Sequence, residues 1–311
     1  MNAKFSPMEP VSWPAPFNNP GFVHQLKWDG IRIIAEVRRD GARLRTRRGG
    51  VRTETYPELH VLTKILLGES AVLDGEAVVL DEEGRPSFGR ILRRDRTRKV
   101  TAALSRELPV HYVVFDLLSV NGEWLLDRPL ARRQEILAAI LPEEAPVAIC
   151  RSLPDGVELF QATGALGLEG IVSKELAGRY HLGCKHPTWR KVKHSRRLQA
   201  VVGGILLKQG RAKAVLLGLY SGRDLVYIGR AAAGLSERDL TVLTGIARTH
   251  AAGRSPLKDT PSLSRGLEVA WLEIPLTARV RFTGWTDQGR LRNPVLEGFG
   301  DQAPEDCVFP F

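Results

Sequence analysis

The sequence contains few cysteines and no long apolar run, and each absence excludes a class of protein. Only three of its 311 residues are cysteines (Cys150, Cys184 and Cys307), with no Cys-x-x-Cys pair, so a disulfide framework is excluded and a reducing cytosol is favoured. Cys184 and His186 lack a second ligand pair, which argues against a zinc site. No apolar run approaches the ~18 residues of a membrane span, and the Pro- and Asn-rich residues 1–20 do not resemble a signal peptide. We therefore expect a soluble, cytoplasmic protein with no membrane partner.

Acidic residues are also in the minority. The chain has 45 Lys and Arg against 35 Asp and Glu, which gives a formal net charge of +10 and a pI near 9.8. A balance this basic favours an anionic partner, of which nucleic acid is the commonest. A basic protein without a polyanion partner stays an alternative from charge alone. The most basic stretch, residues 90–99, is expected to form a solvated or DNA-facing helix.

Hydrophobic periodicity and turn signals divide the chain into two α+β domains, residues 1–197 and 198–311, at a charge-dense stretch that we expect to act as the hinge, near residues 196–198. The first should be built of antiparallel sheets with flanking helices, and the second of about five strands and one helix, which fits a small barrel of the OB type. The N-terminal part predicts strands at 31–37, 42–46, 110–118 and 170–173, a pair of β segments kinked at Gly75 over 71–80, and helices at 56–67, 130–141 and 156–166. The C-terminal part predicts strands at 200–207, 214–220, 225–228, 267–274 and 278–283 and a helix at 236–249 with Ser236 as its N-cap.

One lysine lies in a context that can make it a nucleophile. Lys27 is followed by Trp-Asp-Gly-Ile-Arg, and a lysine before x-Asp-Gly is how covalent nucleotidyltransferases present an amine to the α-phosphate of a nucleotide. The amine attacks only without its proton, and partial burial and nearby positive charge favour that neutral form. Lys191 and Lys193 can supply the charge, and they could also neutralise the phosphate in the transition state. The tetrapeptide occurs often by chance, so its neighbours must decide.

The order of further motifs resembles that of ATP-dependent DNA ligases, most closely the ligase module of bacterial non-homologous end-joining ligases, over essentially the whole chain. The matching segments after Lys27 are residues 45–49, 73–76, 114–117, 169–174, 189–193, 227–230, 280–286 and 289–294. The resemblance implies an adenylation domain followed by an OB-fold domain. It also implies a monomer that uses ATP and Mg²⁺, or Mn²⁺, to seal nicked double-stranded DNA at the nucleoid in DNA repair, with Ku-like end-joining proteins as candidate partners.

The resemblance assigns candidate roles to individual residues. Lys27 would be the catalytic nucleophile, Glu76 and Glu169 would hold the metal ion, and Phe115 would stack on adenine. The candidate ATP or AMP contacts are Gln25, Leu26, Lys27, Arg32, Arg47, Glu76, Phe115, Glu169, Lys174, Lys191 and Lys193. The candidate DNA contacts, which include two arginines of the basic stretch, are Arg32, Arg47, Arg48, Arg93, Arg94, Arg290 and Arg292.

Several of these residues have a plainer interpretation as well. Glu76 and Glu169 could be ordinary surface carboxylates, although hard oxygen ligands beside a triphosphate suit Mg²⁺. Phe115 lies in an apolar run, so it could be a core aromatic. Lys174 could form a surface salt bridge instead of touching the α-phosphate. Arg32 and Arg47 are expected to meet the 5′-phosphate of the nick, because a planar guanidinium can bind two of its oxygens, but they could also belong to a generic basic face.

Two segments depart from the family pattern. Gln25 stands where the family commonly has the Glu that reads the adenine amino group, and a glutamine carbonyl can still accept from that group. Gly300 and Ala303 stand where the family has an Arg and a Lys that orient the departing pyrophosphate. We hypothesise that Arg290 and Arg292 take over that contact.

Three other functions share parts of this pattern. An RNA ligase or a capping guanylyltransferase would have the same Lys-x-Asp-Gly motif and barrel, although residues 285–294 resemble the DNA enzymes. A non-catalytic DNA-end-binding relative of the ligases would retain the fold without the chemistry, and the altered C-terminal segment keeps this alternative open.

Overall fold

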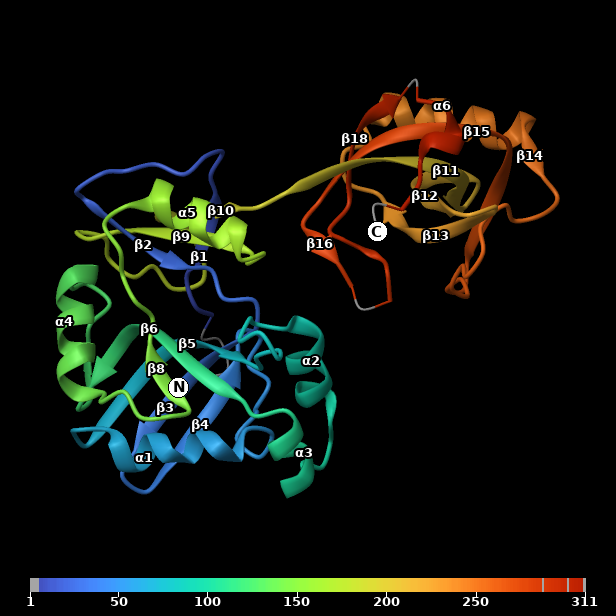
Figure 1. Ribbon diagram of the computed structural model, residues 1–311. Coiled ribbons are helices and arrows are strands. Elements are labelled where there is room, and N and C mark those ends of the chain that lie inside the picture. Colours follow the sequence, from blue (N-terminus) through green and yellow to red (C-terminus); the bar gives the residue numbers. More distant parts are fainter. Residues whose placement is uncertain (1–5, 287, 301, 310–311) are drawn as a thin grey trace. The chain divides into compact units, whose positions relative to one another are not determined.

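The computed structural model describes residues 6–286, 288–300 and 302–309. The chain separates into two units, residues 1–194 and 195–311 (Figure 1). The charged residues 196–198 begin strand β11 (Arg196–Lys208) of the second unit. Among the described residues, no helix is long and apolar enough to cross a membrane.

Unit 1 contains a four-stranded sheet in the order β1-β10-β9-β2 and a six-stranded sheet in the order β4-β3-β5-β6-β7, with β8 beside β6. Most neighbouring strands are antiparallel, which confirms the predicted α+β class. The elements of unit 1 are β1 (Glu9–Ser12), β2 (Phe22–Leu26), β3 (Ile31–Arg38), β4 (Gly41–Thr46), η1 (Pro57–Val61), α1 (Leu62–Ile65), β5 (Ser70–Val78), α2 (Phe88–Arg96), α3 (Ala102–Glu107), β6 (His111–Val120), β7 (Glu123–Trp124), α4 (Leu130–Ile140), β8 (Val147–Ile149), α5 (Gly156–Ala165), β9 (Gly170–Glu175) and β10 (Lys185–Lys193).

Two predicted elements of unit 1 differ in detail. The helix expected over 56–67 is a short 3-10 turn, η1, followed by the single-turn helix α1, because Pro57 starts the turn and Gly68 follows its end. The two β segments expected over 71–80 form one strand, β5. Its pairing with β6 shifts register between Asp74 and Gly75, so the expected kink is a bulge inside a continuous strand.

A buried ion pair joins helix α4 to the larger sheet. Arg133 of α4 and Asp116 of β6 are both fully buried, and two guanidinium nitrogens donate to the two carboxylate oxygens at 2.7 and 2.8 Å. The third nitrogen of Arg133 donates to the backbone carbonyls of Arg128 and Gly178. Because every charged atom finds a partner, α4 is held in one position behind β6, which carries Phe115 on its other face.

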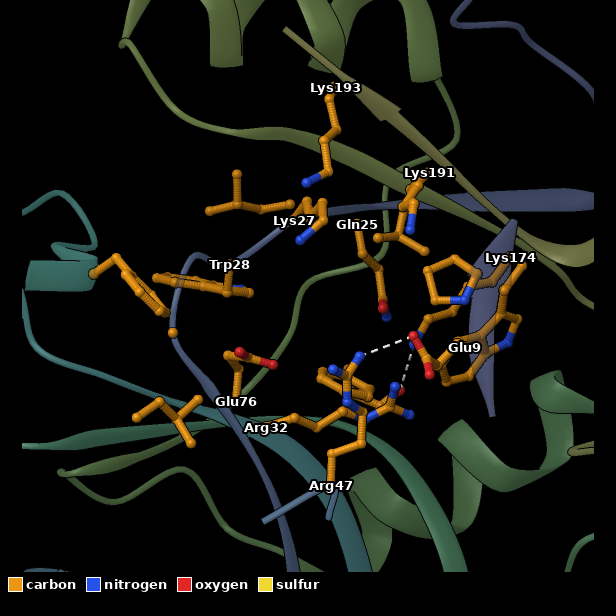
Figure 2. Close-up of a pocket in the computed structure, with 18 of the residues that line it drawn as sticks. Glu9, Gln25, Lys27, Trp28, Arg32, Arg47, Glu76, Lys174, Lys191 and Lys193 are labelled. Atoms are coloured by element: carbon orange, nitrogen blue, oxygen red, sulfur yellow. Dashed lines mark hydrogen bonds and ion pairs between the residues drawn. The ribbon is translucent and has the colours of Figure 1, made fainter. Parts of the chain in front are cut away.

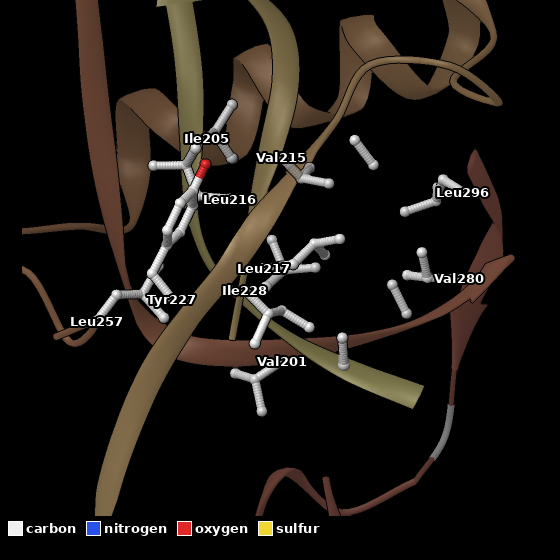
Figure 3. Close-up of a cluster of buried hydrophobic side chains, with 14 of the residues drawn as sticks. Val201, Ile205, Val215, Leu216, Leu217, Tyr227, Ile228, Leu257, Val280 and Leu296 are labelled. Atoms are coloured by element: carbon white, nitrogen blue, oxygen red, sulfur yellow. The ribbon is translucent and has the colours of Figure 1, made fainter. Parts of the chain in front are cut away.

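Unit 2 is a six-stranded sheet in the order β13-β12-β11-β15-β14, with β18 also paired to β15, and a two-stranded ribbon of β16 and β17. Helix α6 begins at the predicted N-cap, Ser236, which forms a capping box with Asp239. The hydrophobic core of unit 2, drawn in Figure 3, contains buried aliphatic side chains from β11, β12, β13 and β15. The remaining bounds are β12 (Arg211–Ser221), β13 (Asp224–Ala231), α6 (Glu237–Thr249), β14 (Ala251–Ala252), β15 (Leu267–Phe282), β16 (Gly284–Trp285), β17 (Leu291–Arg292), β18 (Val295–Gly300) and η2 (Pro304–Asp306).

The expected barrel is only partly formed. The strand pairings among the described residues run from β13 to β14 and do not close into a ring. The two strands predicted at 267–274 and 278–283 are one strand, β15. Val202 pairs with Leu276 and Gly204 with Trp271, so residues 272–275 bulge out of the ladder with β11. Pro275 lies in that bulge and therefore needs no ladder hydrogen bond.

Candidate active site

A cavity of about 590 Å³ lies in unit 1, and both sheets of the unit contribute to its walls (Figure 2). Its lining residues come from all four strands of the smaller sheet (β1, β2, β9 and β10), from β3, β4, β5 and β6 of the larger one, and from segments beside them. Seven of them are basic and two are acidic. A cavity with this balance attracts a polyanion such as a triphosphate. The lining residues are Glu9, Pro10, Gln25, Leu26, Lys27, Trp28, Gly30, Ile31, Arg32, Thr46, Arg47, Arg48, Glu76, Phe88, Phe115, Val172, Lys174, Trp189, Lys191 and Lys193.

Lys27 lies where the chain crosses from one sheet to the other. It follows the last residue of β2, and its backbone N–H donates to the carbonyl of Gly170 at 2.9 Å. The chain then passes Gly30 into β3, and a Cβ on Gly30 would come within 2.3 Å of the Ala77 carbonyl oxygen. Only glycine therefore allows this close approach to β5. The crossing places the Lys27 side chain in the cavity (Figure 2).

Glu169 binds two of the lysines at once. Lys27 Nζ lies 2.7 Å from one carboxylate oxygen, and Lys193 Nζ lies 2.5 Å from the other. Burial favours the protonated acid, but the two lysines outweigh it and hold the pKa of Glu169 below its ordinary value. Burial, followed by the charges of Lys193 and Lys27, lowers the pKa of the neighbouring Lys191. The three lysines predicted to surround the reacting phosphate are therefore close enough to influence one another.

Glu76 faces the same cavity from β5 without a hydrogen bond or ion pair in the part of the chain that the structure describes. Burial raises its pKa to about 8, although Lys27 and Arg32 act in the opposite direction. Glu76 and Glu169 also influence each other electrostatically. Two carboxylates with such a mutual effect beside a phosphate site fit the donor set that Mg²⁺ uses, which is one or two carboxylates plus substrate oxygens. The described residues contain no cluster of three or more His, Cys, Asp or Glu that could bind a metal ion without a substrate.

Phe115 lies half-buried in a cluster of aromatic rings and cations. Its ring meets that of Trp189 edge to face, with 6.0 Å between centroids. Lys174 Nζ lies 4.4 Å from the Phe115 centroid and 4.0 Å from that of Trp189, and it donates to the Phe115 carbonyl at 3.1 Å. Burial lowers the pKa of Lys174 to about 8. Phe115 is thus part of the cavity wall and of the packing behind it, and Lys174 is buried rather than a surface residue.

Arg32 is held in place by its neighbours. Its Nε and Nη2 donate to the two oxygens of the buried Asp74 at 2.9 and 2.6 Å, and Nη2 also lies 3.2 Å from the hydroxyl of Tyr180. Among the described residues, only Nη1 of this guanidinium has no bonded partner. Arg32 therefore has one nitrogen, Nη1, to offer a phosphate, because Asp74 accepts from the other two nitrogens of the guanidinium.

Arg47 and Arg48 lie exposed at the end of β4, and Arg47 pairs with a residue that sequence reasoning missed. Glu9 Oε2 accepts from Arg47 Nη1 at 2.9 Å (Figure 2). Glu9 reaches the cavity because β1 pairs in parallel with β10, with Glu9 beside Lys185. No local pattern marks Glu9, since its partner strand lies far along the chain. Trp28 and Phe88 are further lining residues that carried no predicted role.

Arg93 and Arg94 of helix α2 do not line this cavity. Arg93 is exposed on α2 and pairs with Glu107 at 2.7 Å. Arg94 is fully buried, and its guanidinium binds Glu58 and the Thr55 carbonyl, so the prediction that it faces DNA is wrong for this structure. The side chain at this position anchors the helix because it points toward η1 rather than toward solvent.

Arg290 and Arg292 belong to unit 2. The Arg290 guanidinium donates to the Asp259 carbonyl at 2.9 Å and lies 4.9 Å from the ring centroid of Tyr227. Gly300, at the end of β18, lies beside Gln199, whose side-chain oxygen would be 2.8 Å from a Cβ at that position. A side chain larger than hydrogen would have to displace Gln199, so this segment is packed for the glycine it has.

Two family models match the chain, one within each unit. Residues 12–193 match the ATP dependent DNA ligase domain, and residues 208–301 match the ATP dependent DNA ligase C terminal region. The chain therefore belongs to the ATP-dependent DNA ligases, and the predicted family and the OB-fold type of its second domain are confirmed.

Several named DNA ligases are similar to this chain in sequence or in structure. The chain is 34% identical over 289 residues to the multifunctional non-homologous end joining protein LigD of Mycobacterium bovis, a match that covers 91% of this chain and 36% of LigD. It is 36% identical over 230 residues to a probable DNA ligase of Streptomyces coelicolor, with 69% of this chain and 44% of that protein covered. Mycobacterial DNA ligase D complexed with ATP and MES superposes with a TM-score of 0.58 at 30% identity over 99% of both chains. The chain thus spans about a third of the length of its LigD relatives.

Proposed function

We propose that this chain seals nicks between a 5′-phosphate and a 3′-hydroxyl in double-stranded DNA through a covalent Lys27–AMP intermediate. The observation that carries the proposal is the position of Lys27, which lies between two sheets at a cavity lined by seven basic side chains. Membership of the ATP-dependent DNA ligases supports the assignment of this lysine as the nucleophile. The other lining residues then supply binding and charge stabilisation.

In the first step, Lys27 Nζ forms a bond to the α-phosphorus of ATP, and pyrophosphate leaves. Lys27 Nζ pairs with the Glu169 carboxylate at 2.7 Å, and the amine attacks only without its proton, so it must leave this carboxylate and lose a proton before it attacks. Lys193 binds the other oxygen of Glu169 and can retain it when Lys27 departs. Lys191 and Lys193 then neutralise charge that builds on the phosphate.

Glu76 and Glu169 are the residues that would hold Mg²⁺, or Mn²⁺ in its place. Such an ion, when bound, would neutralise phosphate oxygens next to the reacting centre. The raised pKa of Glu76 supports this role. Burial favours its neutral form, and a bound cation would supply the partner that stabilises its charged form.

In the later steps, AMP passes from Lys27 to the 5′-phosphate of the nick, and the 3′-hydroxyl then attacks that phosphate and releases AMP. Arg47 and Arg48 are exposed at the cavity and are the candidates for the 5′-phosphate. Basic residues elsewhere would add salt-sensitive contacts to the duplex. We place this activity in DNA repair at the nucleoid, carried out by a monomer that can meet Ku-like end-joining proteins.

A labelling experiment tests the proposal. The purified chain with Mg²⁺ and [α-³²P]ATP should gain one AMP, as seen by mass, and lose it when pyrophosphate is added. Lys27→Arg, which keeps the positive charge, should gain none. Labelling by GTP instead of ATP would indicate a capping enzyme, and sealing only of nicks with RNA at the 3′-hydroxyl would indicate an RNA ligase. If wild type and Lys27→Ala both bind nicked DNA and both fail to seal it, the chain is a non-catalytic end-binding relative.

The departure at Gly300 and Ala303 leads to a second labelling experiment. If Arg290 and Arg292 orient pyrophosphate, the double Arg→Ala variant should lose adduct formation from ATP. The same variant should still seal a nick whose 5′ end is already adenylated, because that reaction has no pyrophosphate to release. Robust adduct formation in the double variant would contradict the hypothesis.

A further inference from the structure

A chain of hydrogen bonds behind the cavity fixes the side-chain amide of Gln25. Gln25 lies on β2 with only 2% of its surface exposed, and its side chain points into the cavity (Figure 2). Its Nε2 donates to Ser152 Oγ at 3.0 Å and to the Cys150 backbone carbonyl at 3.4 Å. A backbone carbonyl can only accept, so the NH₂ group must be on this side of the amide. In the described part of the chain, Gln25 Oε1 accepts no hydrogen bond.

The role of Ser152 as an acceptor is itself fixed by Gln134. Gln134 Nε2 donates to Ser152 Oγ at 3.2 Å, and the Ser152 hydroxyl donates to Gln134 Oε1 at 3.4 Å. Because this bond uses the only proton of the hydroxyl, Ser152 can act only as an acceptor toward Gln25. The arrangement therefore presents the carbonyl of Gln25, and not its NH₂ group, to a ligand.

Gln25 Oε1 is not among the buried atoms that lack a partner in the described part of the chain, so it is open to the cavity and can accept a hydrogen bond from a ligand. Phe115 lines the same cavity, and its partly exposed ring offers a flat apolar surface for a base. A purine with an amino group at position 6 would bring an N–H donor to Gln25 Oε1, whereas a purine with a 6-oxo group would bring a second acceptor. The geometry thus distinguishes adenine from guanine.

We propose that Ser152 is a positioning residue that selects adenine over guanine by holding the Gln25 amide in one orientation. The inference rests on the proposed function and extends it to the choice of nucleotide. To accept a 6-oxo purine, Gln25 would have to turn its NH₂ group toward the base. Its Oε1 would then face the Cys150 carbonyl, which offers no donor, and the bond to Ser152 would be lost as long as Gln134 keeps the hydroxyl proton.

Noncovalent binding to a chain that cannot form the adduct tests the inference. Equilibrium dialysis would measure Kd for ATP and for GTP with Lys27→Ala, with Lys27→Ala/Ser152→Ala and with Lys27→Ala/Ser152→Thr. Ser152 is exposed, so its truncation does not open a core cavity. Loss of one hydrogen bond to the amide should lower the preference for ATP over GTP about fivefold or more. The threonine variant keeps the hydroxyl and should retain the preference.

Each outcome bears on the inference. An unchanged ratio of the two Kd values in the alanine variant would overturn it, and so would an equal loss of affinity for both nucleotides, which indicates a purely structural role. A normal preference for ATP in Lys27→Ala combined with a wild-type chain that forms no adduct would overturn the proposed chemistry and leave the base selection standing. Failure of Lys27→Ala to bind either nucleotide would overturn both.

Discussion

Replacing Glu76 by glutamine should make the protein more stable, and increasingly so as the pH rises. Burial raises the pKa of Glu76 to about 8 from an ordinary value of 4.5. Between these two values the folded chain keeps a proton on Glu76 that the unfolded chain has lost. The folded state therefore binds more protons, and the free energy of unfolding of the wild type falls as the pH rises through this window. Glutamine mimics the neutral acid at every pH and removes this loss.

The size of the effect follows from the difference between the two pKa values. Below about pH 4.5 both states are protonated, and the variant and the wild type should be similar in stability. At about 1.4 kcal/mol per pH unit, the wild type should be about 1 kcal/mol less stable than Glu76→Gln at pH 5.5 and about 4 kcal/mol less stable at pH 8. A residue proposed to hold a metal ion would thus destabilise the protein in the absence of that ion.

Urea unfolding without divalent metal, at pH 5.5 and pH 8, would measure these differences. Tryptophan fluorescence reports mainly on unit 1, because four of the six tryptophans (Trp13, Trp28, Trp124 and Trp189) lie there. The exposed Glu54 offers a matched control, since Glu54→Gln removes the same charge outside the cavity. If Glu76→Gln and wild type differ by the same amount at both pH values, the reasoning is refuted.

Three other predictions follow from the geometry. In Lys27→Arg, which should form no adduct, the affinity for the Mg²⁺ complex of ATP should rise with pH toward about 8 as Glu76 loses its proton, and isothermal calorimetry of this variant with and without Glu76→Gln would show whether it does. Arg133→Met should lower the free energy of unfolding by about 3–5 kcal/mol, because it leaves the buried Asp116 carboxylate without its partner. Adding Asp116→Asn should recover much of that loss when unfolding is measured in urea. If the second substitution recovers nothing, the ion-pair explanation is wrong. Glu9→Gln should free Arg47 and tighten binding of a nick with a 5′-phosphate by a few-fold. Binding of a 5′-hydroxyl nick should change less, and an equal gain for both would indicate a general charge effect.

Local patterns in the sequence predicted most of the individual elements. Helix α4 and helix α6 lie where the apolar spacing and the Ser236 cap place them, because these signals act within a few residues. Strand β15 was divided in two because Pro275 resembles a strand end in isolation. Only its pairing with β11 shows that the proline lies in a bulge of one long strand. The pairing between distant segments determines that β15 is one strand, and no local sequence signal indicates that pairing.

The same limit applies to the candidate site. The resemblance to the ligase motifs indicated Lys27, Glu76 and Lys191, and the structure brings all three to one cavity. Glu9 escaped prediction because its position depends on the parallel pairing of β1 with β10. Arg94 was assigned to DNA from the charge of its neighbours, although the helix turns this side chain inward to Glu58. A run of basic residues shows that a segment is positively charged. Whether one of them contacts DNA or forms a structural ion pair depends on the face of the helix on which its side chain lies.

Two groups at the cavity have pKa values that approach each other. Burial raises the pKa of Glu76 and lowers that of Lys174, each to about 8, so near neutral pH Glu76 is mostly protonated while Lys174 keeps most of its positive charge. A metal cation favours the ionised form of Glu76, and a phosphate favours the protonated form of Lys174. A nucleotide that binds together with a metal ion would therefore release the proton of Glu76 and retain that of Lys174. The metal ion supplies the partner that the ionised Glu76 needs and the phosphate supplies the partner that Lys174 needs, so the protein should bind the complex of nucleotide and metal ion better than either alone.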